Sequence, residues 1–215
     1  MSFKISDTYN YRQLWWLDKL LIGHKGYIAG GCFKNIFNNE RVKDIDVFFE
    51  NKADCLEAIS YYKKEMKEHP NEWRFVYENE KVWSIYSNKE KVRLELVKSV
   101  FGKPKQVISE FDFTITKFAY YKNYDNVDEE NYMAVFEVMF HEDFFEHLHT
   151  KRLVVDDEMI YPVSTFNRVL RYAKYGYQPC RETKIKIVTN LAMLDPKNQK
   201  DFEKELGKSL YEGLD

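Results

Sequence analysis

The 215-residue chain has little cysteine, no excess of positive charge and no long apolar run, and each absence excludes a class of protein. Its 3 cysteines lie far apart without C-x-x-C spacing. This argues against a disulfide framework and a cysteine zinc site, and it predicts a reducing compartment. A net charge of -2 is not the global basic field expected of a strong duplex-DNA binder, so a nucleic-acid partner would need a local basic patch.

No apolar run is long enough to span a bilayer, and residues 1–20 lack the apolar core and cleavage site of a signal peptide. These two features predict a cytoplasmic protein with no membrane partner. The chain is 44% hydrophobic and 17% aromatic. That content is enough to build the core of one large domain or two small ones.

The most informative stretch is a glycine pair followed by two closely spaced aspartates. Residues 27–29 are typical of a short strand that ends at Gly30 and Gly31, and helical spacing follows. Free N–H groups at such a helix N-terminus can bind phosphate. Asp44 and Asp46 lie on one face of the next strand, because side chains alternate along a strand. Two carboxylates so close repel unless a cation lies between them, and Mg²⁺ prefers oxygen ligands.

This layout resembles the signature of the polymerase-β-type nucleotidyltransferases, and most closely the head domain of the tRNA nucleotidyltransferase and bacterial poly(A) polymerase family. That family has a Gly-Gly pair, an Arg-Asp pair and then Asp-x-Asp. Gly30, Gly31, Asp44 and Asp46 match at the same interval, and Lys34 stands where the family has Arg. The resemblance implies that Gly30, Gly31 and Lys34 position the triphosphate of an NTP.

The resemblance also implies a third carboxylate, on a strand after the Asp-x-Asp strand. Three alternating runs separated by turn residues are expected strands: Trp73–Tyr77, Lys81–Tyr86 and Val92–Val97. Glu95 is the best candidate, and the alternative is a solvated residue at the rim of the sheet. With Asp44 and Asp46, Glu95 would form the catalytic and metal-binding set for two Mg²⁺ or Mn²⁺ ions about 4 Å apart.

A second resemblance lies in residues 110–120, EFDFTITKFAY. The family has Arg-Arg-Asp-Phe-Thr-Ile-Asn-Ala-Leu-Ala there, and its Asp helps to hold the sugar and phosphate end of the nucleotide. Asp112 matches that residue, whereas Glu110 and Phe111 replace the two arginines. Lys117 would restore a cation for nucleotide binding. The alternative is a core strand in which Asp112 caps or turns the chain.

A third resemblance lies in residues 166–177, which are similar to the neck region of the same family. Arg168 and Arg171 have its Arg-x-x-Arg spacing, which implies contact with a base, a phosphate or RNA. The alternative is that both arginines cover a core helix from its surface. The Glu-Asp-x-x-Arg element that precedes the neck in tRNA-repairing members is absent from residues 161–165. This argues against an enzyme that selects CTP and ATP.

Three histidines near one another suggest a zinc site, but their spacing argues against it. The segment 141–149, HEDFFEHLH, lacks the His-Glu-x-x-His pattern and has no cysteine nearby. A short helix with a solvated histidine face is therefore expected there.

The three resembling segments occur in the family's order, and they predict an α+β fold. We expect a nucleotidyltransferase-like domain in residues 1–125, with a five-stranded or similar mixed sheet backed by helices. A mainly helical, neck-like domain would follow in residues 126–215. Helices are also expected from Ser6 or Asp7 to about Leu21 and over residues 197–210, and an acidic surface loop over 125–130.

The function that the resemblance implies is nucleotidyl transfer. The hydroxyl of an RNA 3′ end, a small molecule or a protein would attack the α-phosphate of an NTP, and pyrophosphate would leave. Two alternatives remain open at this point. One is a nucleotide-binding module of the same fold that has lost catalysis and acts through partners, and the other is a structural or inhibitory protein.

Overall fold

The computed structural model describes residues 2–128, 133–155, 159 and 161–194. Its contacts divide the chain into two compact units. Ser2–Phe111 and Thr116–Glu142 form the first, here called the sheet unit, whereas Asp112–Ile115 and the residues from Asp143 onward form the C-terminal unit. The boundary predicted between residues 125 and 126 falls inside a strand of the sheet unit.

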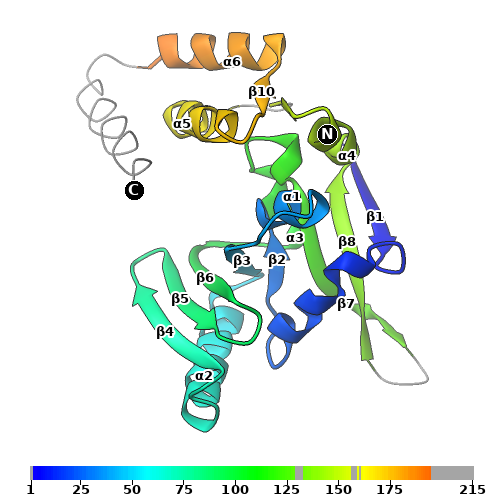
Figure 1. Cartoon of the computed structure of the whole chain (residues 1–215), viewed down its shortest axis with the longest axis vertical. Coiled ribbons are helices and arrows are strands. Elements are labelled where there is room, and N and C mark those ends of the chain that lie inside the picture. The colour runs from blue at the N-terminus through cyan, green and yellow to red at the C-terminus, as the bar shows by residue number, and fades with distance from the viewer. Residues whose placement is uncertain (1, 129–132, 156–158, 160, 195–215) are drawn as a thin grey trace. The chain divides into compact units, whose positions relative to one another are not determined.

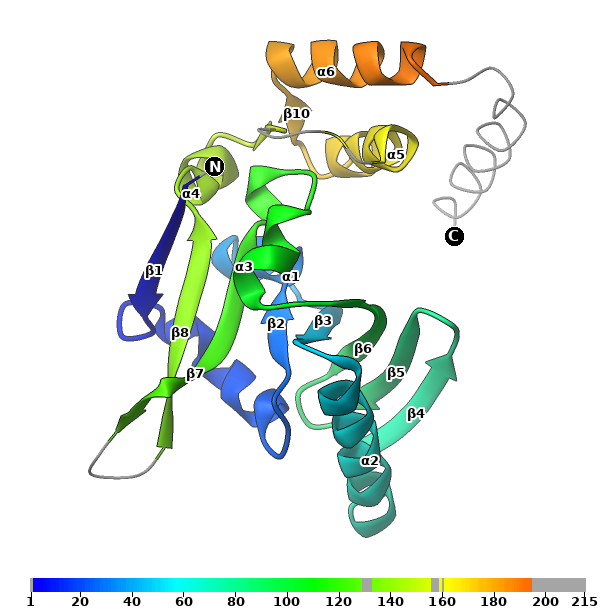
Figure 2. The ribbon, with the colours of Figure 1, turned by 180° about the vertical axis from the view of Figure 1, so that it is seen from behind.

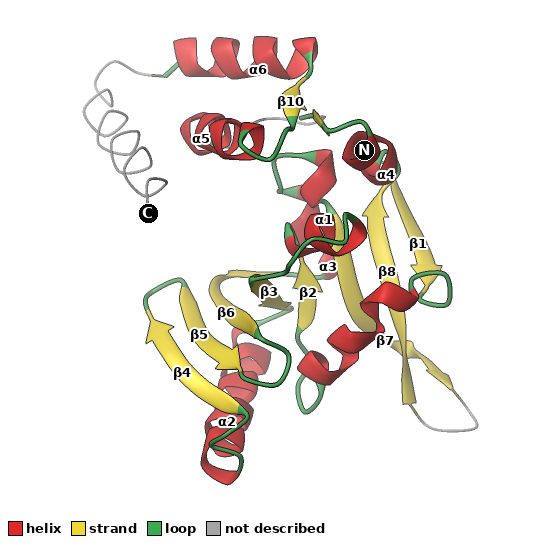
Figure 3. Cartoon of the chain, viewed as in Figure 1, coloured by secondary structure: helices red, strands yellow, loops and turns green. Residues whose placement is uncertain are grey.

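Within the described residues, eight strands form the sheet of this unit, in the order β1-β8-β7-β2-β3-β6-β5-β4 (Figures 1 and 3). The strands are β1 (Phe3–Asp7), β2 (Tyr27–Ala29), β3 (Asp44–Phe49), β4 (Trp73–Glu78), β5 (Val82–Ser87), β6 (Val92–Phe101), β7 (Phe118–Asp128) and β8 (Met133–His141). Neighbouring strands are antiparallel except β3 and β6, which are parallel. The predicted mixed sheet backed by helices is confirmed, although it has more strands than the five expected.

Helices of the sheet unit pack against both faces of this sheet. They are the 3₁₀ helix η1 (Arg12–Leu21), α1 (Cys32–Phe37), α2 (Lys52–Glu68) and α3 (Pro104–Ser109). Asn51 begins α2 as an N-cap, because its side chain accepts a hydrogen bond from the Asp54 backbone N–H at 3.0 Å. Tyr62 of α2 contacts Trp73 of β4, with ring centroids 4.9 Å apart, so α2 covers the face to which Trp73 points (Figure 2).

The N-terminus differs from the helix expected between Ser6 or Asp7 and Leu21. Residues Phe3–Asp7 form β1, an edge strand that pairs with β8, and η1 begins only at Arg12. The sequence predicted an apolar face of Leu14, Trp15, Leu17, Leu20 and Leu21. The four leucines are buried, whereas Trp15 is 45% exposed. Local periodicity therefore identified the buried leucines. It missed β1 because that strand is stabilised by hydrogen bonds to a segment at least 130 residues away along the chain.

The acidic segment expected to be a surface loop also differs over residues 125–128, and its residues 129 and 130 lie outside the described part of the chain. β7 continues to Asp128, and its backbone pairs with β8 up to Met133. The pairing partner is again another strand rather than a local sequence feature, so turn-forming residues alone did not predict it.

The C-terminal unit is mainly helical within the described residues. It contains α4 (Phe144–His149), β9 (Arg152–Leu153), α5 (Pro162–Ala173), β10 (Gln178–Pro179) and α6 (Arg181–Ala192). The helix expected over 197–210 lies outside the described residues. No helix in the described part of the chain combines the length and apolar character needed to cross a membrane.

Residues 112–115 belong to the C-terminal unit through hydrogen bonds. Thr114 Oγ1 lies 2.8 Å from Nδ1 of His147, and the Thr114 backbone N–H donates to the Val154 carbonyl at 3.0 Å. The prediction of a solvated histidine face is wrong for His141 and His147, because both side chains are buried. For His147 the reason is its hydrogen bond to a buried threonine hydroxyl.

His24, 5% exposed, should make the stability of the protein depend on pH. The Gly26 N–H donates to its Nδ1, and its Nε2 lies near the Leu20 carbonyl and the Tyr62 hydroxyl. Burial, and then the charge of Lys122, lowers the pKa of His24 from 6.5 to about 4. The imidazole is therefore neutral in the folded protein.

Because this folded-state pKa is depressed, the unfolded chain takes up a proton before the folded one does. The stabilisation is fully present above about pH 6.5, falls as the pH decreases toward 4, and amounts to about 3 kcal/mol in total. Urea unfolding between pH 7 and pH 5 measures the slope. His24→Gln should flatten this slope, and the exposed His69→Gln should leave it unchanged. A wild-type free energy of unfolding that is flat over this range would contradict the assignment.

Candidate functional site

The three carboxylates predicted to bind metal lie on two neighbouring parallel strands. β3 and β6 pair so that Asp44 is opposite Arg93 and Asp46 is opposite Glu95. Residues directly opposite on paired strands share a face of the sheet. Asp44 and Asp46 share one face, as predicted, and Glu95 lies on the same face; the three are called the acidic row below. Arg93 is in register with Tyr86 of β5, and Tyr86 is in register with Arg74 of β4, so Arg74 also lies on this face. Trp73 precedes Arg74 on β4 and therefore points to the opposite face, which is the face that α2 covers.

Arg93 lies among these carboxylates and carries the opposite charge. Its Nη2 is 2.8 Å from Asp44 Oδ1, and its Nε is 3.2 Å from Glu95 Oε1. The second contact is an ion pair by distance, because the buried Nε makes no hydrogen bond with any described residue. Burial alone lowers the pKa of Arg93, but the bond to Asp44 and the charges of Asp44 and Glu95 outweigh it and raise the pKa. The sequence contained a signal for this residue, because alternation places Arg93 and Glu95 on the same face of one strand. Only the register of β3 against β6 reveals its pairing with Asp44.

Two residues from the outer strands complete the surroundings of Glu95. The Tyr77 hydroxyl of β4 donates to Glu95 Oε1 at 2.7 Å. Ser84 of β5 lies between them in register, and it is fully buried, with no hydrogen-bond partner for its Oγ among the residues that the structure describes. Burial, and then the bond to Glu95, raises the pKa of Tyr77, so the phenol stays protonated and remains a donor. Sequence reasoning missed both residues, because neither belongs to a motif.

A glycine turn adjoins the acidic row at the end of β2. Gly30 has φ +104°, and its N–H donates to the Phe118 carbonyl at 3.0 Å. A Cβ built on Gly30 would lie 3.8 Å from Asp46 Oδ2, so the turn and this carboxylate are close neighbours. Gly31 follows as the N-cap of α1 with a helical φ of -70°. Burial, and then the charge of Asp46, raises the pKa of Cys32, which argues against a nucleophilic thiolate there.

The two glycines should respond differently to alanine. Gly30→Ala should lower the free energy of unfolding by about 1–3 kcal/mol, because a side chain rarely adopts its positive φ. The cost comes from the backbone and not from a clash, since the nearest heavy atom to the added Cβ is 3.6 Å away. Gly31→Ala is the matched control and should stay within about 1 kcal/mol of wild type. Equal effects of the two substitutions in urea unfolding would contradict this account.

The two lysines predicted to contact the nucleotide are both buried in the sheet unit. Lys34 Nζ lies 3.2 Å from Glu40 Oε2, and Lys117 Nζ donates to the Ser109 carbonyl at 3.3 Å. Each ammonium group thus has an oxygen partner within its own unit. Their roles with a nucleotide stay predictions.

Asp112, Arg168 and Arg171 belong to the C-terminal unit. The Arg168 guanidinium donates to Asp112 Oδ2, and the exposed fraction is 7% for the Asp112 side chain and 43% for Arg168. Asp112 therefore orients Arg168. The sequence had indicated both residues as candidates, but it did not predict the ion pair between them. Arg171 is exposed, next to the buried Val169 in sequence, as expected for a surface arginine of α5.

The ligand atoms that the acidic row offers, carboxylate oxygens, are of a kind that suits a divalent cation. Carboxylate oxygens are the ligands that Mg²⁺ and Mn²⁺ prefer. Three carboxylates and one guanidinium leave a formal charge of −2, which a divalent cation would balance. Asp44 is paired with Arg93, Glu95 accepts a hydrogen bond from Tyr77, and Asp46 adjoins the glycine turn.

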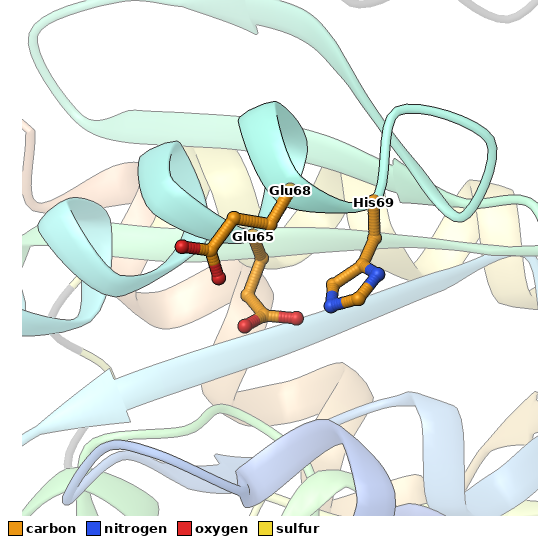
Figure 4. Close-up of side chains that lie close together, drawn as sticks. All are labelled: Glu65, Glu68 and His69. Atoms are coloured by element: carbon orange, nitrogen blue, oxygen red, sulfur yellow. The ribbon is translucent and has the colours of Figure 1, made fainter.

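A different group of metal-ligand side chains lies at the end of α2 (Figure 4). Within the described residues, Glu65, Glu68 and His69 are the group of three whose ligand atoms all lie within 4.8 Å of one another. Glu68 also pairs with Lys64 at 3.7 Å, and both side chains of that pair are largely exposed. An exposed acidic group with its own lysine counter-ion is common on protein surfaces, and we build no site on it.

Solved structures of CCA-adding enzymes have a similar fold. The Thermotoga maritima CCA-adding enzyme complexed with tRNA matches 87% of this chain and 45% of its own, at 15% identity and a TM-score of 0.56. A CCA-adding enzyme in complex with CTP matches 98% of this chain and 50% of its own, at 15% identity and a TM-score of 0.62. At this identity the similarity establishes the fold, and the predicted nucleotidyltransferase-type fold is confirmed.

Sequence comparison gives the family. A model described as "Gabija anti-defense 2 family protein" matches residues 7–151. Gabija anti-defense 2 of Bacillus phage SPbetaL7 is 22% identical over 185 residues, which are 86% of this chain and 42% of that protein. The chain thus spans less than half the length of this relative. The matched segment includes the glycine turn and the whole acidic row, and it covers well over half of the chain, so the chain belongs to the Gabija anti-defense 2 family.

Proposed function

We propose that the chain is a metal-dependent nucleotidyltransferase, which moves an NMP from an NTP to an acceptor hydroxyl with release of pyrophosphate. We further propose that this reaction counters the Gabija defence after which the family is named. The observation that carries the proposal is the acidic row beside the Gly30 turn: Asp44, Asp46 and Glu95 share one face, and Asp46 adjoins the turn.

In the proposed reaction, the chain aligns the reactants and balances their charge. Asp46, with Asp44 and Glu95, would hold Mg²⁺ or Mn²⁺, which supplies Lewis-acid stabilisation of the phosphate oxygens. The Gly30 turn has no side chain, so a triphosphate could approach the backbone there, beside Gly31. Arg93 and Tyr77 keep Glu95 in one orientation. Fixed charges of this kind cost no reorganisation during the reaction.

Residues outside the acidic row are assigned nucleotide contacts in the same proposal. Asp112 would orient Arg168 toward the nucleotide or RNA, and Arg171 would add a second cation. The ammonium groups of Lys34 and Lys117 would leave their present protein oxygen partners and donate to phosphate oxygens instead. An RNA 3′ end is one acceptor in this proposal, because CCA-adding enzymes of similar fold were solved with tRNA.

The test is a label-transfer experiment with the full chain. Each NTP, labelled at the α-phosphate, is incubated with Mg²⁺ or Mn²⁺ and with cellular RNA, cellular protein or small-molecule extract in separate reactions. The expected result is label on one class of acceptor and an equal amount of pyrophosphate. Pyrophosphate release without label transfer, or neither product with any NTP, contradicts the proposed reaction.

A second candidate is a nucleotide-binding module that opposes the defence through contact with a partner and without catalysis. It is favoured by the ion pairs that already engage Asp44, Glu95 and Lys34. Saturable NTP binding in calorimetry, together with full anti-defence activity of Asp46→Asn in infected cells, would support this second candidate over the first.

A further inference from the structure

A row of side chains crosses the outer strands on the face that carries the acidic row. Arg74 of β4 is in register with Tyr86 of β5. Tyr86 is in register with Arg93 of β6, which lies opposite Asp44 of β3. Residues directly opposite on paired strands share a face of the sheet. Arg74 and Tyr86, called the outer pair below, therefore lie on the same face as the candidate site, opposite to the face that α2 covers.

The outer pair combines an aromatic ring with a cation. The Arg74 Cζ lies 4.6 Å from the centroid of the Tyr86 ring, which is a cation–π contact. Arg74 is exposed and Tyr86 is half-buried. Arg93 is paired with Asp44, whereas no carboxylate in the described part of the chain forms an ion pair with Arg74. The outer pair thus offers a ligand an aromatic ring and a cation that has no acidic counter-ion there.

A ring beside a cation suits single-stranded nucleic acid. Every base has a face that can stack on an aromatic ring or on a guanidinium, and the guanidinium can bind the adjoining phosphate. In a duplex the bases are stacked on one another, and a net charge of -2 gives no strong field for duplex binding. An acidic peptide would pair with Arg74 but would bring no planar group for the Tyr86 ring.

The order of the strands decides which substrate meets the outer pair. The Gly30 turn follows β2, the acidic row lies on β3 and β6, and the outer pair lies on β5 and β4 (Figure 1). The acidic row is therefore between the turn proposed for the triphosphate and the outer pair. The attacking and leaving oxygens of a phosphoryl transfer lie roughly in line, on opposite sides of the phosphorus. With pyrophosphate leaving at the turn, the acceptor hydroxyl comes from the side of the outer pair.

We propose that the outer pair binds the end of a single-stranded nucleic acid, which is the acceptor of the NMP. One base stacks on Tyr86, and the Arg74 guanidinium binds a phosphate. Tyr86 lies two strand spacings, about 10 Å, from Asp44, which is the length of roughly three stacked nucleotides. The terminal hydroxyl oxygen bonds to the α-phosphorus, the bond from that phosphorus to the pyrophosphate oxygen breaks, and the hydroxyl proton passes to water. The fate of the strand as acceptor rests on the proposed function, but its binding can be measured without any NTP.

The first experiment measures binding of the full chain to labelled single strands by fluorescence polarisation. One strand is RNA and one is DNA, each about 12 nucleotides long. Wild type should bind one of them about tenfold more tightly than the duplex of the same sequence. Tyr86→Leu should weaken this binding about tenfold, and Tyr86→Phe, which keeps the ring, by less than about twofold. No saturable binding of either strand, equal binding of the duplex, or wild-type affinity in Tyr86→Leu would each overturn the inference.

Arg74→Gln tests the cation of the outer pair. It should weaken binding about fivefold and reduce the slope of log affinity against log salt by about 0.7, because one phosphate contact is lost. Arg12→Gln is the matched control, since Arg12 is also exposed and its Cζ lies 5.2 and 5.7 Å from the ring centroids of Tyr9 and Trp15. Arg12 begins η1, which adjoins α2 through the hydrogen bond from Tyr62 to the Leu20 carbonyl. Its affinity should stay within about twofold of wild type, and equal losses in the two variants would overturn the inference.

Cross-linking to the wild-type chain decides the matter even if a Tyr86 variant fails to fold. A single strand with 5-bromouridine at the third nucleotide from its 3′ end is irradiated with the full chain, and the linked peptide is identified by mass spectrometry. Linkage to β4 or β5 is expected. Linkage only to segments outside these two strands would contradict the assignment.

The label-transfer assay separates this result from the proposed function. With the bound strand as acceptor, Tyr86→Leu should raise the KM for the strand about tenfold and leave the KM for NTP unchanged. Strand binding at the outer pair without NMP transfer leaves the outer pair as a nucleic-acid site and removes the proposed function. NMP transfer to a protein or a small molecule, without strand binding, removes the inference and leaves the proposed function standing.

Discussion

Asp46→Asn is expected to lower the rate of NMP transfer on the order of 10³-fold while the protein stays folded. Asp46 is the carboxylate of the acidic row that adjoins the Gly30 turn, with its Oδ2 3.8 Å from the position of an added Cβ. The substitution keeps the shape of the side chain and removes the charge that would balance a cation. The measurement is pyrophosphate release at saturating NTP, together with thermal unfolding to verify the fold.

The matched control is Glu57→Gln, which removes one carboxylate charge from the exposed side of α2. It should leave the rate within about twofold of wild type, because α2 covers the face of the sheet opposite to the acidic row. A loss of less than about tenfold in Asp46→Asn would argue against a catalytic role for the acidic row. A comparable loss in Glu57→Gln would indicate a non-specific effect of charge.

Phe118→Ala is expected to destabilise the protein by about 3–5 kcal/mol. Phe118 of β7 is fully buried, and its ring contacts Phe33 and Phe37 of α1 and Phe140 of β8, with centroid distances of 4.4, 5.2 and 5.4 Å. Removing the ring would leave a cavity between α1 and two strands. Its carbonyl also accepts the Gly30 N–H, so a backbone shift at this position would reach the glycine turn.

Guanidinium chloride unfolding measures this effect, with Phe75→Ala as the control. Phe75 is also a strand phenylalanine, but it is 51% exposed, so truncation should cost less than about 1.5 kcal/mol. A Phe118→Ala value no larger than that of Phe75→Ala would show that the aromatic cluster contributes little.

Much of the local structure of this protein follows from its sequence. Alternation placed Asp44 and Asp46 on one face of a strand, and the glycine pair marked a turn where only Gly30 needs a positive φ. The predicted strands near residues 73–77, 81–86 and 92–97 correspond to β4, β5 and β6. These features depend on the backbone conformation of a few consecutive residues, which the residues themselves favour.

The surroundings of the candidate site were decided by tertiary structure. The parallel pairing of β3 with β6 aligned Arg93 with Asp44, and the bond from Tyr77 to Glu95 spans three strands. The ion pair of Asp112 with Arg168 joins residues 56 positions apart. Such contacts depend on which distant segments meet and in what register. Alternation along one strand determines which face a residue occupies, but not which residue lies opposite on its neighbour, and for this reason the counter-ion of the acidic row emerged only from the fold.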